Sequence, residues 1–78
     1  MMTLIGKTFA KKVNGTVVLR TITGEWYQAS DKEKPYRYYN VSVTQVFKNG
    51  QTYKYTSDYL YADSFDKQVK ADVWKEIN

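Results

Sequence analysis

Residues 36–61 read YRYYNVSVTQVFKNGQTYKYTSDYLY, two runs of β-branched and aromatic residues that meet at Asn49-Gly50. Such residues are typical of strands, and Asn-Gly favours a two-residue type I′ turn because both central residues of that turn need positive φ. The same dipeptide recurs at Asn14-Gly15, again between β-branched runs. The sequence therefore predicts two antiparallel hairpins, with strands at about 3–13, 16–28, 36–48 and 51–61.

The remaining segments join or follow these hairpins. The stretch 29–35 is polar and ends in Pro35, which is typical of a loop. Gly24 predicts a bulge or bend within the long second strand. In the last segment, Phe65, Val69, Val73 and Ile77 recur at helical spacing, which favours a helix over about 64–77 that begins at a cap on Asp63 or Ser64. Alternation of apolar residues within 68–77 leaves a strand there as the alternative.

Length and composition limit both the fold and the chemistry. The chain has 78 residues, no cysteine and no histidine, so it is predicted to form one domain without disulfides, Cys/His zinc sites or a Ser-His-Asp triad. Its carboxylates form no pair with an arguable catalytic geometry. We therefore expect a non-enzyme without metal or cofactor. The expected fold is mainly β, a small OB- or SH3-like barrel or a curled sheet, with a C-terminal helix.

The second hairpin has a tyrosine-rich face if its turn is tight. A two-residue loop places Lys48 opposite Gln51, and the alternation of side chains then divides the hairpin into two faces. One face would carry the aliphatics Val41, Val43 and Leu60 with Phe47, which suits the core. The other would carry Tyr38, Tyr53, Tyr55, Tyr59 and Tyr61 with Asn and hydroxyl residues. Tyrosine hydroxyls need partners when buried, so this face is predicted to bind a ligand, although a protein interface or plain cross-strand packing would also use tyrosines.

The first hairpin contributes cations. A tight turn at Asn14-Gly15 aligns Lys7, Lys11 and Arg20 on one face, interleaved with Phe9 and aliphatic residues. Alternating cations and rings suit a groove that follows a nucleic-acid backbone, whereas on a solvated face the same cations would simply cover apolar residues. The net charge of +4 favours polyanions only modestly. Trp26 and Trp74 are expected to serve packing.

Two segments carry a resemblance to a known group of proteins. They are Lys34-Pro35-Tyr36, which leads into Tyr38–Val43, and the tyrosine-rich run Tyr53–Tyr61. In their pattern of residue types they resemble the small single-stranded-DNA-binding proteins of phages and mobile elements, which are built on OB-type barrels. The resemblance covers about half of the chain, includes no diagnostic motif, and departs from that group in its low net charge and acidic tail. The chain also resembles the three-stranded sheet plus helix of arm-type DNA-binding domains of integrases, which would imply duplex binding through the sheet.

Together these features predict a non-catalytic protein that binds single-stranded nucleic acid largely without sequence preference, with DNA favoured over RNA. The alternative is a small phage-type interaction module that inhibits or recruits a host protein through the same tyrosines. Self-association into a homodimer is expected because one such face spans few nucleotides. The chain has no apolar run of membrane-spanning length and no signal-peptide pattern, so we expect a cytoplasmic protein with no membrane partner. The residues expected to contact nucleic acid are Lys7, Lys11, Lys12, Arg20, Tyr36, Arg37, Tyr38, Tyr53, Lys54, Tyr55, Tyr59 and Tyr61.

Overall fold

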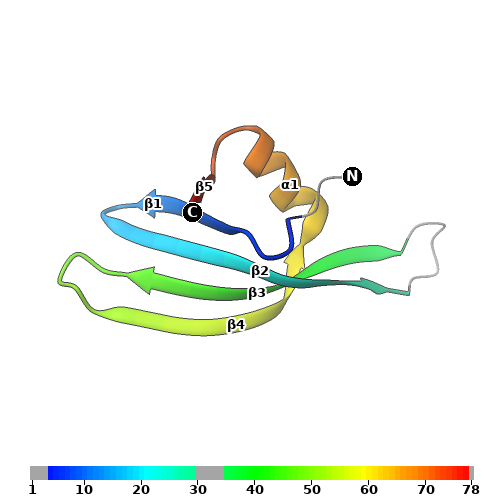
Figure 1. Cartoon of the computed structure of the whole chain (residues 1–78), viewed down its shortest axis with the longest axis horizontal. Coiled ribbons are helices and arrows are strands. Elements are labelled where there is room, and N and C mark those ends of the chain that lie inside the picture. Colours follow the sequence, from blue (N-terminus) through cyan, green and yellow to red (C-terminus); the bar gives the residue numbers. More distant parts are fainter. Residues whose placement is uncertain (1–3, 30–34, 78) are drawn as a thin grey trace.

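A computed structural model describes residues 4–29 and 35–77 of the chain (Figure 1). They form one antiparallel sheet of five strands and one helix. The elements are β1 (Thr8–Val13), β2 (Thr16–Gln28), β3 (Tyr36–Val46), β4 (Thr52–Tyr61), α1 (Ala62–Lys70) and β5 (Lys75–Ile77).

The sheet is curled but not closed. Its strand order is β4-β3-β2-β1-β5, so β4 and β5 are the two edges. The expectation of a mainly β fold with a C-terminal helix is confirmed, and of the two predicted forms it is the curled sheet that is found. Figure 1 shows the helix on one face of the sheet, with the tips of both hairpins at the same end of the molecule.

The first hairpin has the predicted register. Val13 pairs with Thr16, and the ladder runs regularly to Thr8 opposite Thr21. Asn14 and Gly15 both have positive φ, 51° and 83°, as a type I′ turn requires. The first strand begins later than expected, at Thr8, because Gly6 has a φ of 88° and turns the chain. Residue 3, where that strand was expected to begin, lies outside the described residues.

The second hairpin has a longer loop than predicted. The Phe47 N–H donates to the Gln51 carbonyl at 2.9 Å, and the ladder begins with Val46 opposite Thr52. The loop therefore contains Lys48, Asn49 and Gly50. In the described loop only Gly50 has positive φ, 87°, as in hairpins that end on a left-handed glycine. The expected pairing of Lys48 with Gln51 was wrong.

A bulge in β4 restores the expected register farther from the turn. Val41 lies opposite Ser57, but Tyr39 lies opposite Leu60, so two residues of β4 face Asn40 alone. The β2–β3 ladder also shifts between Ile22 and Gly24, which confirms the bulge predicted at this glycine. The single tyrosine face expected from the sequence was therefore wrong, because the bulge in β4 separates Tyr53 and Tyr55 from Tyr59 and Tyr61.

The C-terminal segment contains both of the predicted alternatives. The helix α1 spans only Ala62–Lys70, and Asp72 then adopts a φ of 62°. The Val73 N–H donates to the Gln68 carbonyl and the Asp72 N–H to the Val69 carbonyl, which is the Schellman pattern that ends helices. Strand β5 follows and pairs with β1.

Two details of the predicted helix were wrong. Val73 and Ile77 lie outside it and are exposed, so they do not extend its apolar stripe. The cap is Tyr61, without a side-chain cap hydrogen bond, rather than Asp63 or Ser64.

The core lies between the helix and one face of the sheet. Phe9, Ile22, Tyr39, Val41, Val43, Ala62, Phe65 and Trp74 are buried there, and Leu60 and Val69 pack against them. The inward placement of Val41, Val43 and Leu60 agrees with the sequence, whereas Phe47 is 40 % exposed. The predicted loop at 29–35 falls mostly outside the described residues.

Candidate functional site

Two rows of cross-strand partners cross the sheet on the face that the helix partly covers, here called the inner face. Phe9 pairs with Arg20, Arg20 with Val43, and Val43 with Tyr55. In the next row towards the hairpin tips the partners are Lys11, Val18, Gln45 and Tyr53. Direct partners point to the same face of a sheet. The cations of the first hairpin and two tyrosines of the second therefore share one surface.

The inner site comprises Lys11, Arg20, Tyr53, Tyr55 and Trp74. The two tyrosine rings lie 5.6 Å apart and are 57 % and 39 % exposed, so both offer open faces. Three interstrand spacings separate Lys11 from Tyr53, a span of about 14 Å. The site thus presents rings at one side and cations at the other, over a length of a few nucleotides.

Both cations lie over the Trp74 indole. The Arg20 guanidinium is 4.4 Å from the ring centre and the Lys11 ammonium 5.7 Å, within the range of cation–π attraction. Burial lowers the pKa of Arg20 from its ordinary value, an effect that the nearby Tyr55 hydroxyl opposes. In residues 4–29 and 35–77, neither cation joins an ion pair. A bound anion would supply the negative charge that these two cations lack among the described residues. It would also offset the solvation that Arg20 loses through burial.

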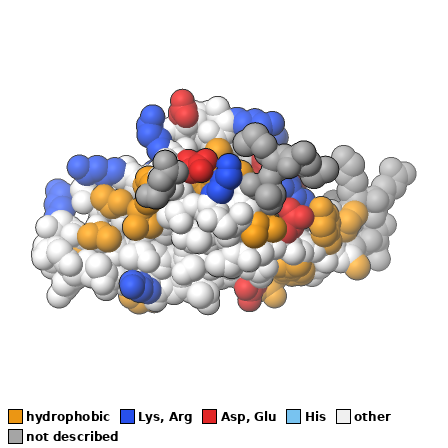
Figure 2. All heavy atoms as spheres, viewed as in Figure 1, with side chains coloured by type: hydrophobic (Ala, Val, Ile, Leu, Met, Phe, Trp, Pro, Cys, Tyr) orange, Lys and Arg blue, Asp and Glu red, His pale blue; other side chains and the backbone are white. Residues whose placement is uncertain are grey.

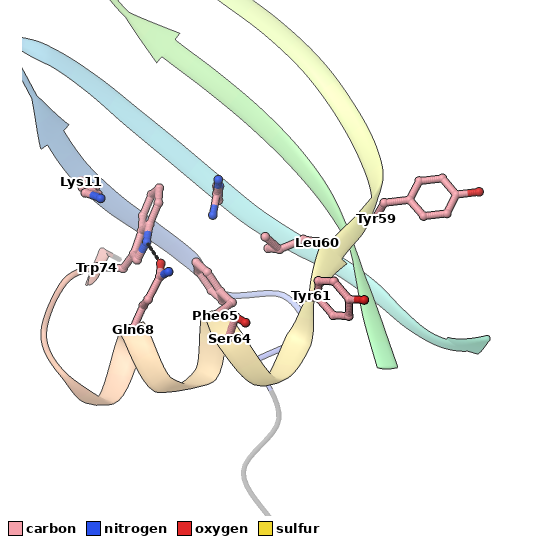
Figure 3. Close-up of a pocket in the computed structure, with 9 residues that line it drawn as sticks. Lys11, Tyr59, Leu60, Tyr61, Ser64, Phe65, Gln68 and Trp74 are labelled. Carbon is pink, nitrogen blue, oxygen red and sulfur yellow. Dashed lines mark hydrogen bonds between the residues drawn. The ribbon is translucent and has the colours of Figure 1, made fainter. Parts of the chain in front are cut away.

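A pocket of about 450 Å³ opens between α1 and the inner face (Figure 3). In Figure 3 the Trp74 indole stands between Lys11 and Phe65, and its N–H donates to the side-chain amide oxygen of Gln68 at 2.9 Å. Tyr59 and Tyr61 also border the pocket, but their rings point away from it. The pocket therefore continues the inner site under the helix and does not include those two rings.

A second group of rings lies on the opposite, outer face of the sheet. Trp26 stacks on Tyr38 at 4.9 Å, Tyr38 stacks on Tyr61 at 5.0 Å, and Tyr59 meets Trp26 edge-on at 5.5 Å. Tyr36 meets Tyr61 edge-on at 6.1 Å. We call these five residues the outer aromatic cluster. Tyr59 is 69 % exposed and Tyr61 50 %.

Polar contacts hold this cluster in place. The Trp26 indole N–H donates to the Asp58 carbonyl at 2.7 Å, and the Asn40 amide donates to the Asp58 carboxylate at 3.0 Å. Both contacts reach the bulged part of β4. The cluster itself contains no cation.

The other predicted phosphate contacts lie apart from the inner site. Lys12 and Lys54 are on the outer face, where Lys12 pairs with Val17 and Lys54 with Thr44. The Lys7 ammonium lies 3.5 Å from the Glu76 carboxylate. Figure 2 shows Lys and Arg side chains dispersed over the visible surface rather than gathered in one patch.

Arg37 is engaged in a network beneath the start of the helix. Its guanidinium donates to Glu25 at 3.0 Å, to Asp63 at 2.8 Å and to Asp66 at 3.1 Å. Burial would lower its pKa, but the hydrogen bonds with Glu25 and Asp66 outweigh burial and raise it. With three carboxylates around it, Arg37 is not included in the inner site.

Tyr39 completes the same network from inside the core. Its hydroxyl donates to Asp66 at 2.6 Å and accepts from Arg37 at 2.8 Å. Burial and the hydrogen bond to Asp66 raise the pKa of Tyr39 above its ordinary value. The network therefore ties the far end of the second hairpin to α1, a packing role.

Sequence reasoning missed Trp74 as a member of the site. The sequence indicated packing, and Trp74 is indeed buried, but its position beneath Lys11 and Arg20 depends on the reversal of the chain at Asp72. The only sequence signal for this reversal is the alternation that favoured a strand at the end of the chain. Phe65 was likewise expected only in the helical stripe, yet its ring lies 5.6 Å from the Arg20 guanidinium.

Comparisons with known proteins identified no relative of this chain. No family model matches the chain, and no match was found among the curated proteins or the solved structures. In the part of the chain that the structure describes, no helix is long and apolar enough to cross a membrane. The same residues contain no cluster of three side chains suited to hold a metal ion.

Proposed function

We propose that this protein binds single-stranded nucleic acid through the inner site, without catalysing a reaction on it. The observation that carries the proposal is the shared face of Lys11 and Arg20 from one hairpin and Tyr53 and Tyr55 from the other. DNA is favoured over RNA, and the proposed location is the cytoplasm.

The chemistry of the site supports a single strand as the ligand. Unpaired bases can stack on exposed tyrosine rings, and each stacked base contributes about 1–3 kcal/mol. The two cations are free of ion pairs among the described residues and can contact phosphates. A duplex would hide its bases from the rings, so two exposed tyrosine rings beside two cations suit a single strand better.

The salt dependence of binding follows from the number of cations. Two phosphate contacts on a single strand predict that log K falls with log salt at a slope of about −1.4, at about −0.7 per contact. This shallow slope is expected because Lys7 and Arg37 are already paired with carboxylates. Affinity for a short strand should therefore depend more on stacking than on charge.

The test is the affinity of a fluorescently labelled ten-nucleotide oligo-dT, measured by anisotropy at several salt concentrations. The double substitution Tyr53→Ala/Tyr55→Ala should cost about 2–6 kcal/mol and leave the salt slope unchanged, because stacking displaces no counterion. Lys11→Gln should weaken binding and reduce the slope by about 0.7.

Matched controls come from the outer face. Tyr59→Ala/Tyr61→Ala removes the same residue types, and Lys12→Gln the same charge, so both variants should bind as the parent does. All variants need thermal melts that show a folded protein. Absence of binding by the parent at low salt, or equal losses from inner and outer pairs, would refute the proposal.

The outer aromatic cluster supports a second candidate, a protein-interaction surface that inhibits or recruits a host protein. Tyrosine and tryptophan dominate binding hot spots, and charged residues are depleted at interface centres. Five packed aromatic rings meet that description. In pull-downs from cell extract, Tyr59→Ala/Tyr61→Ala should abolish capture of a partner, whereas Tyr53→Ala/Tyr55→Ala should not. Capture should persist at high salt because the cluster is uncharged.

A further inference from the structure

Strand β4 is a long, open edge of the sheet. It spans ten residues and is exposed at eight of them, and among the described residues it pairs only with β3. Figure 1 shows nothing beyond it at the lower edge of the molecule. Open strand edges of this length readily pair with another chain unless they are blocked.

The backbone of β4 presents hydrogen-bonding groups to that edge at known positions. The Phe47 N–H donates to the Gln51 carbonyl, and hydrogen-bonded pairs alternate along an antiparallel ladder. Gln45/Tyr53 and Val43/Tyr55 are therefore also hydrogen-bonded pairs. The N–H and C=O groups of Lys54 and Thr56 consequently point outward, in the regular part of β4 between the loop and the bulge.

The only two charged residues of β4 have opposite signs and lie on either side of Thr56. They are Lys54 and Asp58. Figure 2 shows Lys or Arg spheres and Asp or Glu spheres at separate points along this edge. Asn40 holds one carboxylate oxygen of Asp58 at 3.0 Å, which fixes the carboxylate on the outer face, where Lys54 also lies.

We propose that β4 pairs antiparallel with β4 of a second copy of this chain, with Thr56 at the two-fold axis. Lys54 of each copy then lies opposite Asp58 of the other, and both ion pairs form on the outer face. The outward backbone groups of Thr56 form a hydrogen-bonded pair with those of Thr56 in the second copy. One sheet would then run through both molecules.

Charge selects this register from the neighbouring ones. A two-fold axis at Lys54 would bring two ammonium groups together, and one at Asp58 would bring two carboxylates together, both unfavourable across strands. An axis at Tyr55 would place Lys54 opposite Thr56 and Asp58 opposite Thr52. An axis at Ser57 would place Asp58 opposite Thr56 and Lys54 opposite Leu60, so neither register forms an ion pair. Of these registers, only the one with its axis at Thr56 pairs Lys54 of each copy with Asp58 of the other, which gives two ion pairs.

The arrangement also joins the two inner sites. An axis perpendicular to the sheet keeps both inner faces on the same side, with Tyr55 opposite Ser57 of the second copy. Tyr53 and Tyr55 of the two copies would then line one continuous strip. The dimer does not depend on nucleic-acid binding, because its contacts lie in β4 alone.

The first experiment measures the mass of the free protein by sedimentation equilibrium between about 1 and 500 μM, without nucleic acid. The parent should sediment with twice the mass of one chain at the upper concentrations. Lys54→Asp and Asp58→Lys should each be monomeric, and the double variant Lys54→Asp/Asp58→Lys should dimerise again. Lys12→Asp, which makes the same charge change away from the edge, should dimerise as the parent does.

The second experiment tests the position of the axis. The chain has no cysteine, so Thr56→Cys introduces a single thiol. Hydrogen-bonded antiparallel partners have Cα atoms about 5.5 Å apart, within the range that a disulfide spans. Under mild oxidation Thr56→Cys should form a covalent dimer at least tenfold faster than Thr52→Cys, whose thiols would lie far from the axis.

A parent protein that stays monomeric at 500 μM overturns the proposal. So does a double variant Lys54→Asp/Asp58→Lys that stays monomeric although it melts at the same temperature as the parent. Equal cross-linking rates for the two cysteine variants overturn the register. Each of these results leaves the oligonucleotide affinity of the inner site as a separate measurement, so failure of the dimer and failure of the proposed function are distinguishable.

Discussion

The two hairpins carry the same Asn-Gly dipeptide at their tips, yet the chain turns differently at each. In the first, both residues have positive φ and form the whole loop. In the second, Gly50 has positive φ and Lys48 joins the loop, so that Phe47 pairs with Gln51. This single additional loop residue moves every side chain of β4 between the loop and the bulge to the opposite face.

Burial explains why the second hairpin departs from the tight turn. A two-residue loop would place Lys54 and Asp58 on the inner face, opposite Gln45 and Val41. The longer loop places Tyr55 beside the buried Val43 instead, and it moves Lys54 to the outer face. Of these two charges only Asp58 would meet a buried residue, Val41, and a carboxylate beside apolar core residues loses solvation at a cost. Asn-Gly therefore specifies a reversal of the chain, whereas the packing of the strands decides the loop length.

The largest expected effect concerns the polar anchor of the second hairpin. Tyr39→Phe removes two hydrogen bonds inside the protein and leaves Asp66 and Arg37 with one partner fewer, which should cost about 1–3 kcal/mol of unfolding free energy. Urea unfolding at pH 7 measures this loss. An unchanged stability would mean that the apolar core alone holds this hairpin on the helix.

The stability of the same variant should also depend on pH differently from that of the parent. Because folding raises the pKa of Tyr39, its contribution is complete below the unfolded pKa of about 10 and is lost as pH rises through the folded value. The stability difference between the parent and Tyr39→Phe should be constant from pH 7 to about 9.5 and shrink above pH 10. A difference that grows with alkalinity would contradict the raised pKa.

A smaller effect is expected from alanine at the two turn glycines. Gly15 and Gly50 both have positive φ, so alanine should cost about 1–2 kcal/mol at either position. At Gly15 the new methyl group would also collide with the Lys48 side chain, whereas the space around Gly50 is open. The exposed Lys48 side chain can swing aside, so thermal melts should show losses of similar size at the two glycines. An unchanged melting temperature for one variant would show that its turn does not need positive φ.

The smallest effect is expected from deletion of Lys48. This deletion leaves Phe47-Asn49-Gly50-Gln51, in which a two-residue turn preserves the observed Phe47/Gln51 pair. Stability should change by less than about 1 kcal/mol, the range typical of surface changes, and NMR contacts between Val43 and Tyr55 should remain. If the loop were instead the two-residue one, the deletion would flip β4, and these contacts would disappear.

Much of the fold could be predicted because it depends on neighbours in sequence. The first hairpin, the span of β2 and the bulge at Gly24 follow from turn residues and β-branched runs. The division of the tyrosines between the two faces of the sheet could not be predicted. It depends on a bulge in β4 opposite Asn40, and that bulge forms only when β4 pairs with β3. The end of the helix was likewise hidden, since Asp72 takes the left-handed position that glycine usually occupies.

For the candidate site, the residue types were predictable and their grouping was not. Lys11 and Arg20 follow from the register of one tight turn, and the rings of Tyr53 and Tyr55 were recognised as ligand-binding material. That these four share a face, that Arg37 is held by three carboxylates, and that Trp74 lies under both cations depend on contacts between distant segments.

Turn signals and residue types were therefore enough to predict two tyrosine-rich hairpins and a helix after them. The tertiary structure decided which rings face the cations. The physical reason is the two-residue period of a strand: one residue more or less in a loop or bulge reverses a face. The turn residues leave that count open, and the packing of the strands against the core, which exists only in the folded chain, sets it.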